Sequence, residues 1–181
     1  GYNLGMKVLE TPRLTLHRLV LEDAPFILEL VNDPAWLQFI GDKQVHNLED
    51  ARNYIRNGPL DMYARLGFGL YLVTLKTGIR IGLCGLIKRD ALADVDLGFA
   101  LLAGFRGKGY AQESASAVLE YAKNTLGLRR ILAIASPDNQ RSIKVLENIG
   151  FGYEQTLILS GQVHATKLFA CPPDSSQTGA S

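Results

Sequence analysis

The sequence predicts an α/β fold in which helices cover a mixed sheet. Segments in which apolar and polar residues alternate, as in strands, are interspersed with segments whose apolar residues recur at helical spacing. Two apolar segments on either side of Lys76-Thr77-Gly78 have the pattern of an antiparallel hairpin. The next strand-like segment leads through a basic, glycine-rich loop into a long helical pattern, an order of elements typical of layered α/β proteins.

Each expected element has its own local signal. Acidic residues and Pro25 favour a helix start near Glu22, and Asn47 is a good N-cap for a second helix that a third, short helix follows. The order is one strand, two or three helices, three strands, a helix, a strand, a helix and two strands. Strands are expected at 13–19, 68–75, 79–87, 95–102, 131–135, 153–159 and 162–169, and the main helices at 22–31, 48–56, 110–126 and 141–148.

Length and composition indicate one globular domain. The chain has 181 residues, of which 47% are hydrophobic, enough for a single core. We expect the domain to span residues 6–171. Residues 1–5 are interpreted as an expression scar, and residues 172–181 as a tail rich in Pro, Ser, Thr and Gly outside the core.

Charge and cysteine usage exclude several function classes. A formal net charge of +1 gives no reason to expect a nucleic-acid or membrane partner. Cys84 and Cys171 lack metal-ligand spacing, so we expect unpaired thiols, no metal and a reducing, cytoplasmic setting. The chain has no secretory signal and no apolar run of 18 residues.

The most informative segment is the loop Arg106-Gly107-Lys108-Gly109-Tyr110-Ala111 between a strand and a helix. Its glycines allow a sharp turn and close approach to a ligand, and free N–H groups at the helix start favour phosphates. Leu102 and Gly109 stand where a Walker A loop needs Gly and Ser or Thr, and Gln112 stands where a dinucleotide fingerprint needs Gly. By itself, the remaining Arg-x-x-Gly-x-Ala pattern fits a phosphate site and a ligand-free basic turn equally well.

The loop resembles the pyrophosphate-binding motif of the GCN5-related N-acetyltransferase (GNAT) superfamily. Other segments resemble motifs of its ribosomal-protein (RimJ/RimL-like) acetyltransferase branch in the same order, from Thr11 to Phe169. They are Thr11-Pro12-Arg13-Leu14-Thr15-Leu16, Gly82-Leu83-Cys84-Gly85-Leu86, Asp96-Leu97-Gly98-Phe99-Ala100-Leu101, Asn139-Gln140-Arg141-Ser142 and Glu147-Asn148-Ile149-Gly150-Phe151.

The resemblance implies a GNAT fold, with a mostly antiparallel sheet splayed between its fourth and fifth strands and about four flanking helices. It also implies acetyl-CoA as cosubstrate and no metal. The pantetheine arm would bond the backbone of Phe99, Ala100 and Leu101, with Asn139 on its other side. The pyrophosphate would lie on Arg106, Gly107, Lys108, Gly109, Tyr110 and Ala111, and Ser142 would lie near the sulfur.

The same resemblance suggests catalytic residues. Ser142 matches a serine proposed to serve the leaving thiolate, although a serine capping its own helix is an alternative. Asp96 matches an acidic position and is our candidate general base; its alternative is a solvated strand residue. Many members of the superfamily have a Tyr that acts as the general acid seven residues after the motif Asn. Leu146 stands at that position here, so this general acid is missing. His164 is a second candidate base, with a surface residue as its alternative.

The acceptor side is less defined. His17 stands where the branch usually has Arg, and four aromatic residues are either lining residues or core: Trp36, Phe39, Tyr63 and Tyr71. We therefore expect an N-acetyltransferase that acts on a primary amine, either a protein N-terminus or a small molecule, by direct attack in a ternary complex. The alternative is a non-catalytic acyl-CoA sensor or regulatory module. A monomer and a homodimer are both compatible with the sequence.

Overall fold

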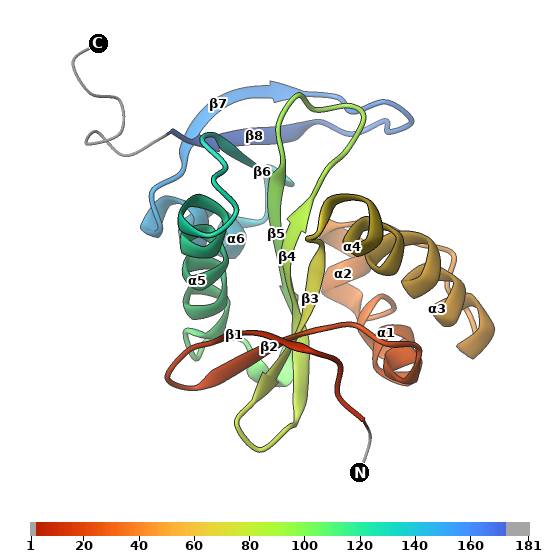
Figure 1. Cartoon of the computed structure of the whole chain (residues 1–181). Helices are drawn as coiled ribbons and strands as arrows, with labels where there is room; N and C mark the ends of the chain where they lie inside the picture. The colour runs from red at the N-terminus through yellow and green to blue at the C-terminus, as the bar shows by residue number, and fades with distance from the viewer. Residues whose placement is uncertain (1–2, 173–181) are drawn as a thin grey trace.

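The computed structural model describes residues 3–172, which form one eight-stranded sheet with helices on both faces (Figure 1). The strands lie in the order β1-β2-β3-β4-β5-β6-β8-β7. Among them only β5 and β6 run parallel, so the predicted mixed, mostly antiparallel sheet is confirmed. The strands are β1 (Lys7–Glu10), β2 (Leu14–Arg18), β3 (Leu70–Leu75), β4 (Arg80–Ile87), β5 (Asp96–Leu101), β6 (Ile131–Ala135), β7 (Gly152–Leu157) and β8 (Thr166–Cys171).

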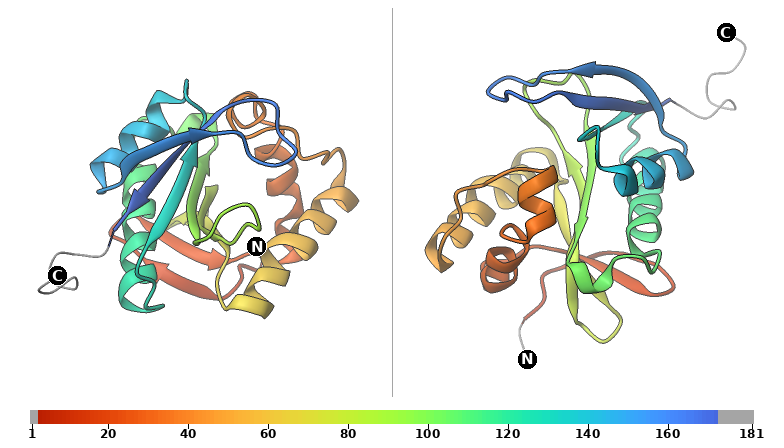
Figure 2. Two further views of the ribbon diagram at one scale, coloured as in Figure 1. Left: turned by 90° about the horizontal axis from the view of Figure 1, so that it is seen from above. Right: turned by 180° about the vertical axis from the view of Figure 1, so that it is seen from behind.

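The helices separate into two groups (Figures 1 and 2). One face of the sheet carries α1 (Ala24–Leu30), α2 (Pro34–Phe39), α3 (Leu48–Ile55) and α4 (Asp61–Leu66), and the other carries α5 (Tyr110–Asn124) and α6 (Gln140–Asn148). Short irregular turns complete the list: η1 (Leu21–Asp23), η2 (Arg56–Leu60) and η3 (Ala103–Phe105). None of the described helices has the length and apolar character that crossing a bilayer requires.

Local chemistry explains where the predicted helices begin and end. The Asn47 side chain accepts a hydrogen bond from the Asp50 N–H at 2.8 Å, which is the predicted N-cap of α3. Pro59 lies inside the π-helical turn η2, so the chain passes from α3 into α4 instead of stopping. Gly127, just beyond α5, has the positive φ that ends a helix.

Strand β1 and helix α2 were not predicted, and the last hairpin has a longer connection than predicted. Strand β1 has only four residues, its two end residues are exposed, and it lies at the edge of the sheet, so it has little alternation to detect. Helix α2 has only six residues, although Asp33 as N-cap and Pro34 at the first position are recognisable start signals. Strand β8 begins at Thr166, later than the predicted residue 162, because residues 158–165 form a longer connection.

The chain termini bear on the expected domain limits. Leu4 packs against the cluster beneath α1, and the Gly5 carbonyl lies 3.2 Å from His17 Nδ1. A Cβ on Gly5 would stand 2.0 Å from the Arg18 carbonyl oxygen, so Gly5 is closely fitted against β2. Residues 1–2 of the expected scar and residues 173–181 of the expected tail lie outside the described residues.

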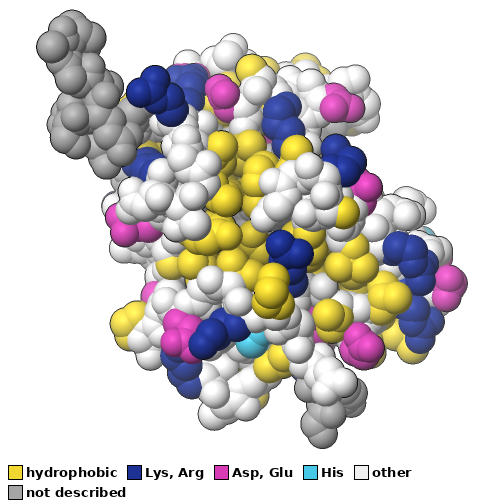
Figure 3. Space-filling view, viewed as in Figure 1, with side chains coloured by type: hydrophobic (Ala, Val, Ile, Leu, Met, Phe, Trp, Pro, Cys, Tyr) yellow, Lys and Arg dark blue, Asp and Glu magenta, His cyan; other side chains and the backbone are white. Residues whose placement is uncertain are grey.

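The core is divided by the sheet. Tyr71 and Val73 on β3 belong to the cluster packed against α5, whereas Leu72 between them belongs to the cluster packed against α1 and α3. Helix α5 buries the predicted apolar face, with Ala111 in its first turn only half-buried. It ends at Asn124, so Leu126, predicted to be its last apolar residue, lies beyond it. On the side shown in Figure 3, hydrophobic side chains gather centrally and charges of both signs are mixed around them, so the described residues of this face form no continuous basic surface.

The sheet opens between β5 and β6. The pairing between these strands is limited to Asp96 opposite Leu132, next to a hydrogen bond from Leu132 N–H to the Val95 carbonyl at 2.9 Å. By contrast, β5 pairs with β4 along its whole length. The predicted splay is therefore confirmed, but it separates the fifth and sixth strands of this chain because β1 adds a strand to the count. Figure 2 shows β5 with α2 on one side and α6 on the other.

Candidate active site

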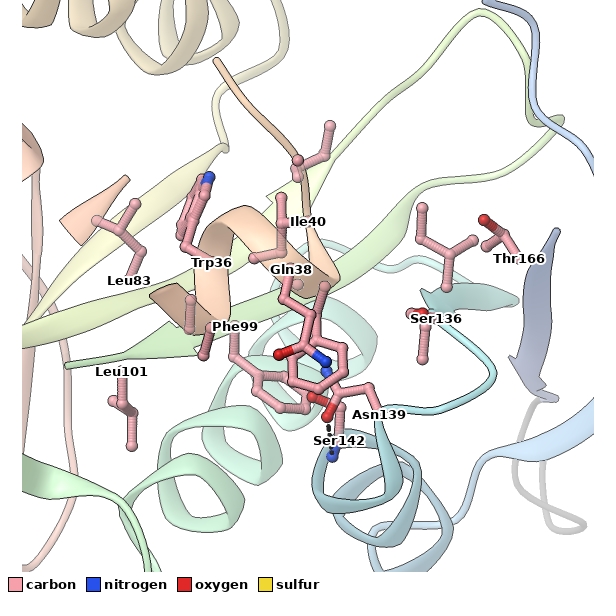
Figure 4. A pocket seen from close by; sticks show the side chains of 18 of the residues that line it. Trp36, Gln38, Ile40, Leu83, Phe99, Leu101, Ser136, Asn139, Ser142 and Thr166 are labelled. Atoms are coloured by element: carbon pink, nitrogen blue, oxygen red, sulfur yellow. Dashed lines mark hydrogen bonds between the residues drawn. The ribbon is translucent and has the colours of Figure 1, made fainter. Parts of the chain in front are cut away.

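A large groove opens where β5 and β6 separate. Its volume of about 2600 Å³ exceeds the roughly 300–1,000 Å³ of a pocket for one small ligand, so it has room for two substrates. The groove is lined by residues 106, 107 and 109–111 of the loop and by the start of α6, and also by α2, α3 and the β7–β8 connection. Lys108, predicted to contact the pyrophosphate, does not line it. In Figure 4, Trp36 and Ile40 stand on one side, Asn139 and Ser142 on the other, and Phe99 lies between them.

The predicted phosphate loop has the expected backbone. Gly107 and Gly109 have φ of +76° and +85°, values that side-chain-bearing residues rarely adopt. Gly109 is the N-cap of α5, so the first N–H groups of a fifteen-residue helix lie next to the groove. This end of the groove is therefore suited to an anion.

The Arg106 side chain has partners within the protein. Its Nη2 donates to Asp33 Oδ1 and to the Leu101 carbonyl, each at 2.8 Å, and so ties the end of β5 to the start of α2. Partial burial opposes ionisation of Asp33, but hydrogen bonds from Arg106 and Ala35 outweigh it, and the pKa of Asp33 lies below its ordinary value. The ion pair leaves the Arg106 backbone, but not a free guanidinium, for the predicted pyrophosphate contact.

The facing wall is the start of α6. Asn139 is the N-cap of this helix, and its Oδ1 accepts from the Ser142 N–H at 3.3 Å (Figure 4). The alternative in which Ser142 caps its own helix is therefore wrong. Ser142 is half-buried and lines the groove, as does Asn139. Leu146 also borders the groove, but it is 1% exposed and belongs to the core.

Asp96 lies at the bottom of the groove. Its carboxylate is 1% exposed and 2.9 Å from Arg89 Nε, so the alternative of a solvated strand residue is wrong. Burial raises the pKa of Asp96 above its ordinary value, and the positive charges of Arg89 and Lys88 only partly offset this effect. A carboxylate with a raised pKa is better matched to proton abstraction near neutral pH than an ordinary one.

Arg89 was not identified from the sequence. It lies just beyond β4, and the pairing of Ile87 with Asp96 brings it beside the start of β5. The groove lowers the pKa of Lys43 by removing water from around its ammonium group, and the charge of Arg89 lowers it further. Burial raises the pKa of Tyr54 to about 12, against the opposing effect of Arg89. Arg89 could have been found from the sequence by aligning the two predicted strands on either side of it, because the pairing of Ile87 with Asp96 places Arg89 near Asp96.

The aromatic and histidine candidates divide between groove and core. Trp36 and Phe39 line the groove, and Trp36 Nε1 is buried with no hydrogen-bond partner in the described part of the chain. His164 lines it from the exposed β7–β8 connection. The other three do not line it: Tyr63 and Tyr71 stack at 5.7 Å in the core, and His17 is buried between the Gly5 carbonyl and Thr74 Oγ1.

Metal chemistry finds no support in the side-chain arrangement. Within residues 3–172, no group of three or more His, Cys, Asp or Glu side chains could hold a metal ion. Cys84 and Cys171 are both buried and unpaired.

Known proteins share both the sequence pattern and the fold. The chain is 29% identical to an uncharacterized N-acetyltransferase, p20, of Bacillus licheniformis over 154 residues, or 84% of this chain and 86% of that protein. It is also 29% identical to an uncharacterized N-acetyltransferase, YoaA, of Bacillus subtilis strain 168, covering 83% of this chain and 85% of that one.

Solved structures show the same architecture. An acetyltransferase from Agrobacterium tumefaciens superposes with a TM-score of 0.77 at 26% identity, covering 94% of this chain and 98% of that one. The ribosomal L7/L12 alpha-N-protein acetyltransferase RimL, in complex with coenzyme A, superposes with a TM-score of 0.80 at 21% identity and 94% and 99% coverage. The family model of the acetyltransferase (GNAT) domain matches residues 13–152. With that match and this fold, the chain belongs to the GNAT family and is an acetyltransferase.

Proposed function

We propose that this enzyme transfers the acetyl group of acetyl-CoA to a primary amine by direct attack in a ternary complex. The observation that carries the proposal is the opening between β5 and β6, which has an anion-binding loop at one end and a buried carboxylate at its base. We also propose that residues 6–171 act as one domain and that the enzyme works in the cytoplasm, where unpaired thiols such as Cys84 persist.

The cosubstrate would bind along the exposed edge of β5. Phe99 to Leu101 have no β6 partner, although the Leu101 carbonyl accepts a hydrogen bond from Arg106 Nη2. Backbone groups that stay unpaired at this edge favour a ligand that bonds them, as the two amides of pantetheine can. The pyrophosphate would accept hydrogen bonds from the backbone of residues 106–111. Asn139 has its amide Nδ2 left to contact pantetheine, because its Oδ1 accepts from Ser142.

In the reaction, the neutral amine attacks the thioester carbonyl, forming the C–N bond as the C–S bond breaks. A backbone N–H on the open edge of β5 stabilises the oxyanion. Asp96 takes the proton that the amine loses, directly or through water. The Ser142 hydroxyl donates a hydrogen bond to the leaving thiolate, which takes its proton from water. An α-amine with a pKa of about 7.7–8.0 needs less help from a base than a lysine amine of about 10.4.

We favour a protein N-terminus over a polyamine as acceptor. Trp36 Nε1, Lys43 and Arg89 place hydrogen-bond donors along the groove, and Trp36 Nε1 is buried without a described partner. A peptide carries carbonyl oxygens next to its amine that can accept from such donors, whereas a polyamine has none, and buried donors without partners are costly. RimL is named for a protein acceptor, and a Vibrio cholerae chimera with a similar fold is named a spermidine N-acetyltransferase.

Titration calorimetry with acetyl-CoA tests the cosubstrate, with ATP and NAD as controls. We expect acetyl-CoA to bind and the other two nucleotides not to bind. Changing both Gly107→Val and Gly109→Val should abolish binding, because Val disfavours the left-handed backbone found at both positions. An absence of acetyl-CoA binding to the wild-type protein would overturn the proposal.

Free-thiol release tests the reaction and the acceptor. With saturating acetyl-CoA, we expect a peptide with a free N-terminus to be acetylated faster than spermidine. A faster reaction with spermidine would overturn the acceptor class, and binding of acetyl-CoA without thiol release for any amine would contradict the proposed reaction.

A further inference from the structure

The start of β2 and the first turn of α5 are joined by a compact polar cluster. Thr11 Oγ1 donates to Glu113 Oε2 at 2.6 Å, and the Arg13 backbone N–H donates to the same oxygen at 3.0 Å. The Arg13 Nε donates to the other oxygen, Oε1, at 2.7 Å. Glu113 thus holds residues about 100 positions away in sequence. We call Thr11, Arg13 and Glu113 the β2–α5 clamp.

Arg13 also contacts the phosphate loop itself. Its Nη1 donates to the Lys108 carbonyl at 2.9 Å, and its guanidinium carbon lies 4.5 Å from the centre of the Tyr110 ring. Between these two, a Cβ on Gly109 would lie 3.2 Å from Arg13 Nη2. One side chain therefore contacts Lys108 and Tyr110 and lies beside the Gly109 between them.

The contact at the Lys108 carbonyl orients a loop N–H. The described chain has no cis peptide bonds, so the C=O of Lys108 and the N–H of Gly109 point in opposite directions. Because the C=O faces Arg13, the N–H of Gly109 is directed away from the clamp. Gly109 lines the main groove and also a shallow hollow that contains Thr11 and Glu113, so the loop separates the two.

The clamp acts through geometry and not through added charge. The Arg13 and Glu113 charges are opposite and 2.7 Å apart, so together they contribute little net field at the groove. The Arg13 side chain is 47% exposed, and exposed ion pairs contribute little to overall stability. Stabilising the whole fold therefore does not account for the number of contacts that converge on residues 108–110.

We propose that Arg13 and Glu113 are positioning residues that hold the Lys108–Tyr110 backbone with its N–H groups turned toward the cosubstrate pyrophosphate. This inference rests on the proposed acetyl-CoA site. Without the clamp, the loop peptides can rotate, and the anion then has to order them as it binds.

The test compares a donor that has the pyrophosphate with one that lacks it. For Arg13→Met, which keeps the stem and removes the donors, we expect the Kd of acetyl-CoA to rise about tenfold, as for the loss of one charged hydrogen bond. The kcat/KM with acetyl-pantetheine, which ends before the pyrophosphate, should stay within twofold of wild type. Glu113→Gln, which keeps the shape of the side chain but loses its charge, should show the same selective loss.

The matched control is Arg130→Met. Arg130 bridges Glu154 at 2.6 Å and Asp94 at 3.6 Å, its side chain is 42% exposed, and it does not line the groove. It should leave the use of both donors unchanged.

Each outcome has a distinct meaning. Unchanged acetyl-CoA binding in Arg13→Met and Glu113→Gln would overturn the inference, and so would equal losses with both donors. If Arg13→Met does not fold, Glu113→Gln and Thr11→Val carry the same comparison. Failure of the wild-type protein to bind acetyl-CoA would instead remove the proposed function on which the inference rests.

Discussion

Single residues in the groove are held by partners that constrain their chemistry. Asp96 is buried against Arg89, Asn139 caps the helix that carries Ser142, and Arg106 is bonded to Asp33. Of these, only Asp96 combines burial, a position in the groove and a raised pKa. It is therefore the residue on which the proposed chemistry depends most.

Asp96→Asn should separate catalysis from cosubstrate binding. The amide has the shape of the carboxylate but cannot accept the amine proton, and general-base catalysis contributes about 10²–10⁴-fold in rate. We expect kcat/KM for the amine to fall by at least about 100-fold, with the Kd of acetyl-CoA unchanged. Steady-state kinetics and calorimetry give the two values, and near-normal turnover would exclude Asp96 as the base.

Arg89→Met should move the pH profile. Burial raises the pKa of Asp96 and Arg89 lowers it, so removing Arg89 raises it further. The base is active when deprotonated, so activity should rise with pH, and in Arg89→Met the acid limb of kcat/KM should lie at higher pH than in wild type. A limb that stays in place, or moves to lower pH, would contradict this pairing. Arg52→Met, on the exposed side of α3, is the control.

At the scale of elements, close packing of β4 against its neighbours shapes the groove. A Cβ on Gly82 would stand 2.2 Å from the Ala100 carbonyl oxygen, and one on Gly85 would stand 2.2 Å from the Gly69 carbonyl oxygen. Both contacts are with backbone, which cannot turn aside as a flexible side chain can. Glycine at these positions lets β3, β4 and β5 approach closely.

Gly82→Ala should therefore destabilise the sheet. Forcing a methyl group against the Ala100 carbonyl is a case of overpacking, which costs about 1–3 kcal/mol. Gly98→Ala on β5 is the matched control, since its Cβ would meet only Ile87 Cδ1 at 3.7 Å. Urea unfolding of the two variants gives the comparison, and equal midpoints would show that the strands accommodate the methyl group.

The β2–α5 clamp should weaken in acid. Partial burial opposes ionisation of Glu113, but hydrogen bonds from Thr11 and Arg13 outweigh it, so its folded pKa lies below the ordinary 4.5. Its stabilisation is therefore fully present above about pH 4.5 and is lost as pH falls through the lower folded pKa. The difference in unfolding free energy between wild type and Glu113→Gln should be constant near neutral pH and shrink below pH 4.5. If the difference in unfolding free energy grew as the pH fell, the predicted direction of the pKa shift of Glu113 would be wrong.

At the scale of the whole molecule, the main feature is the opening of the sheet, which leaves room for a ligand between two of its strands. Beyond Asp96 the strands β5 and β6 are not paired, and residues of the phosphate loop and of α2 line the same groove. A bound cosubstrate would lie between β5 and β6, in the place where the two strands of a continuous sheet would be hydrogen-bonded to each other.

Acetyl-CoA should therefore protect this region and stabilise the protein. At a concentration 100 times Kd, ligand binding adds about 2.7 kcal/mol to the free energy of unfolding. In hydrogen exchange, we expect slower exchange for residues 99–101 and 107–111 and little change in β1 and β2. Protection confined to other segments would place the ligand elsewhere in the molecule.

Sequence reasoning succeeded where the signal is local and failed where it depends on distant partners. Strand β6 was predicted to the residue, and α3 was predicted within one residue, because an apolar run and an N-cap identify them within a few positions. Strand β1 carries no such signal and exists because β2 lies beside it. The alternative role of Ser142 as a cap of its own helix is wrong, since Asn139 occupies that position.

The sequence by itself determined the order of elements and the glycine-rich turn between a strand and a helix, because periodicity and backbone preference act over a few residues. Asp96 was a candidate through the resemblance of its strand to the GNAT motifs. Only the tertiary structure decided which charges meet. Arg89 with Asp96, Arg106 with Asp33 and Arg13 with Glu113 are paired by strand register and helix packing. Such pairings join residues up to 100 positions apart, and no local pattern records them.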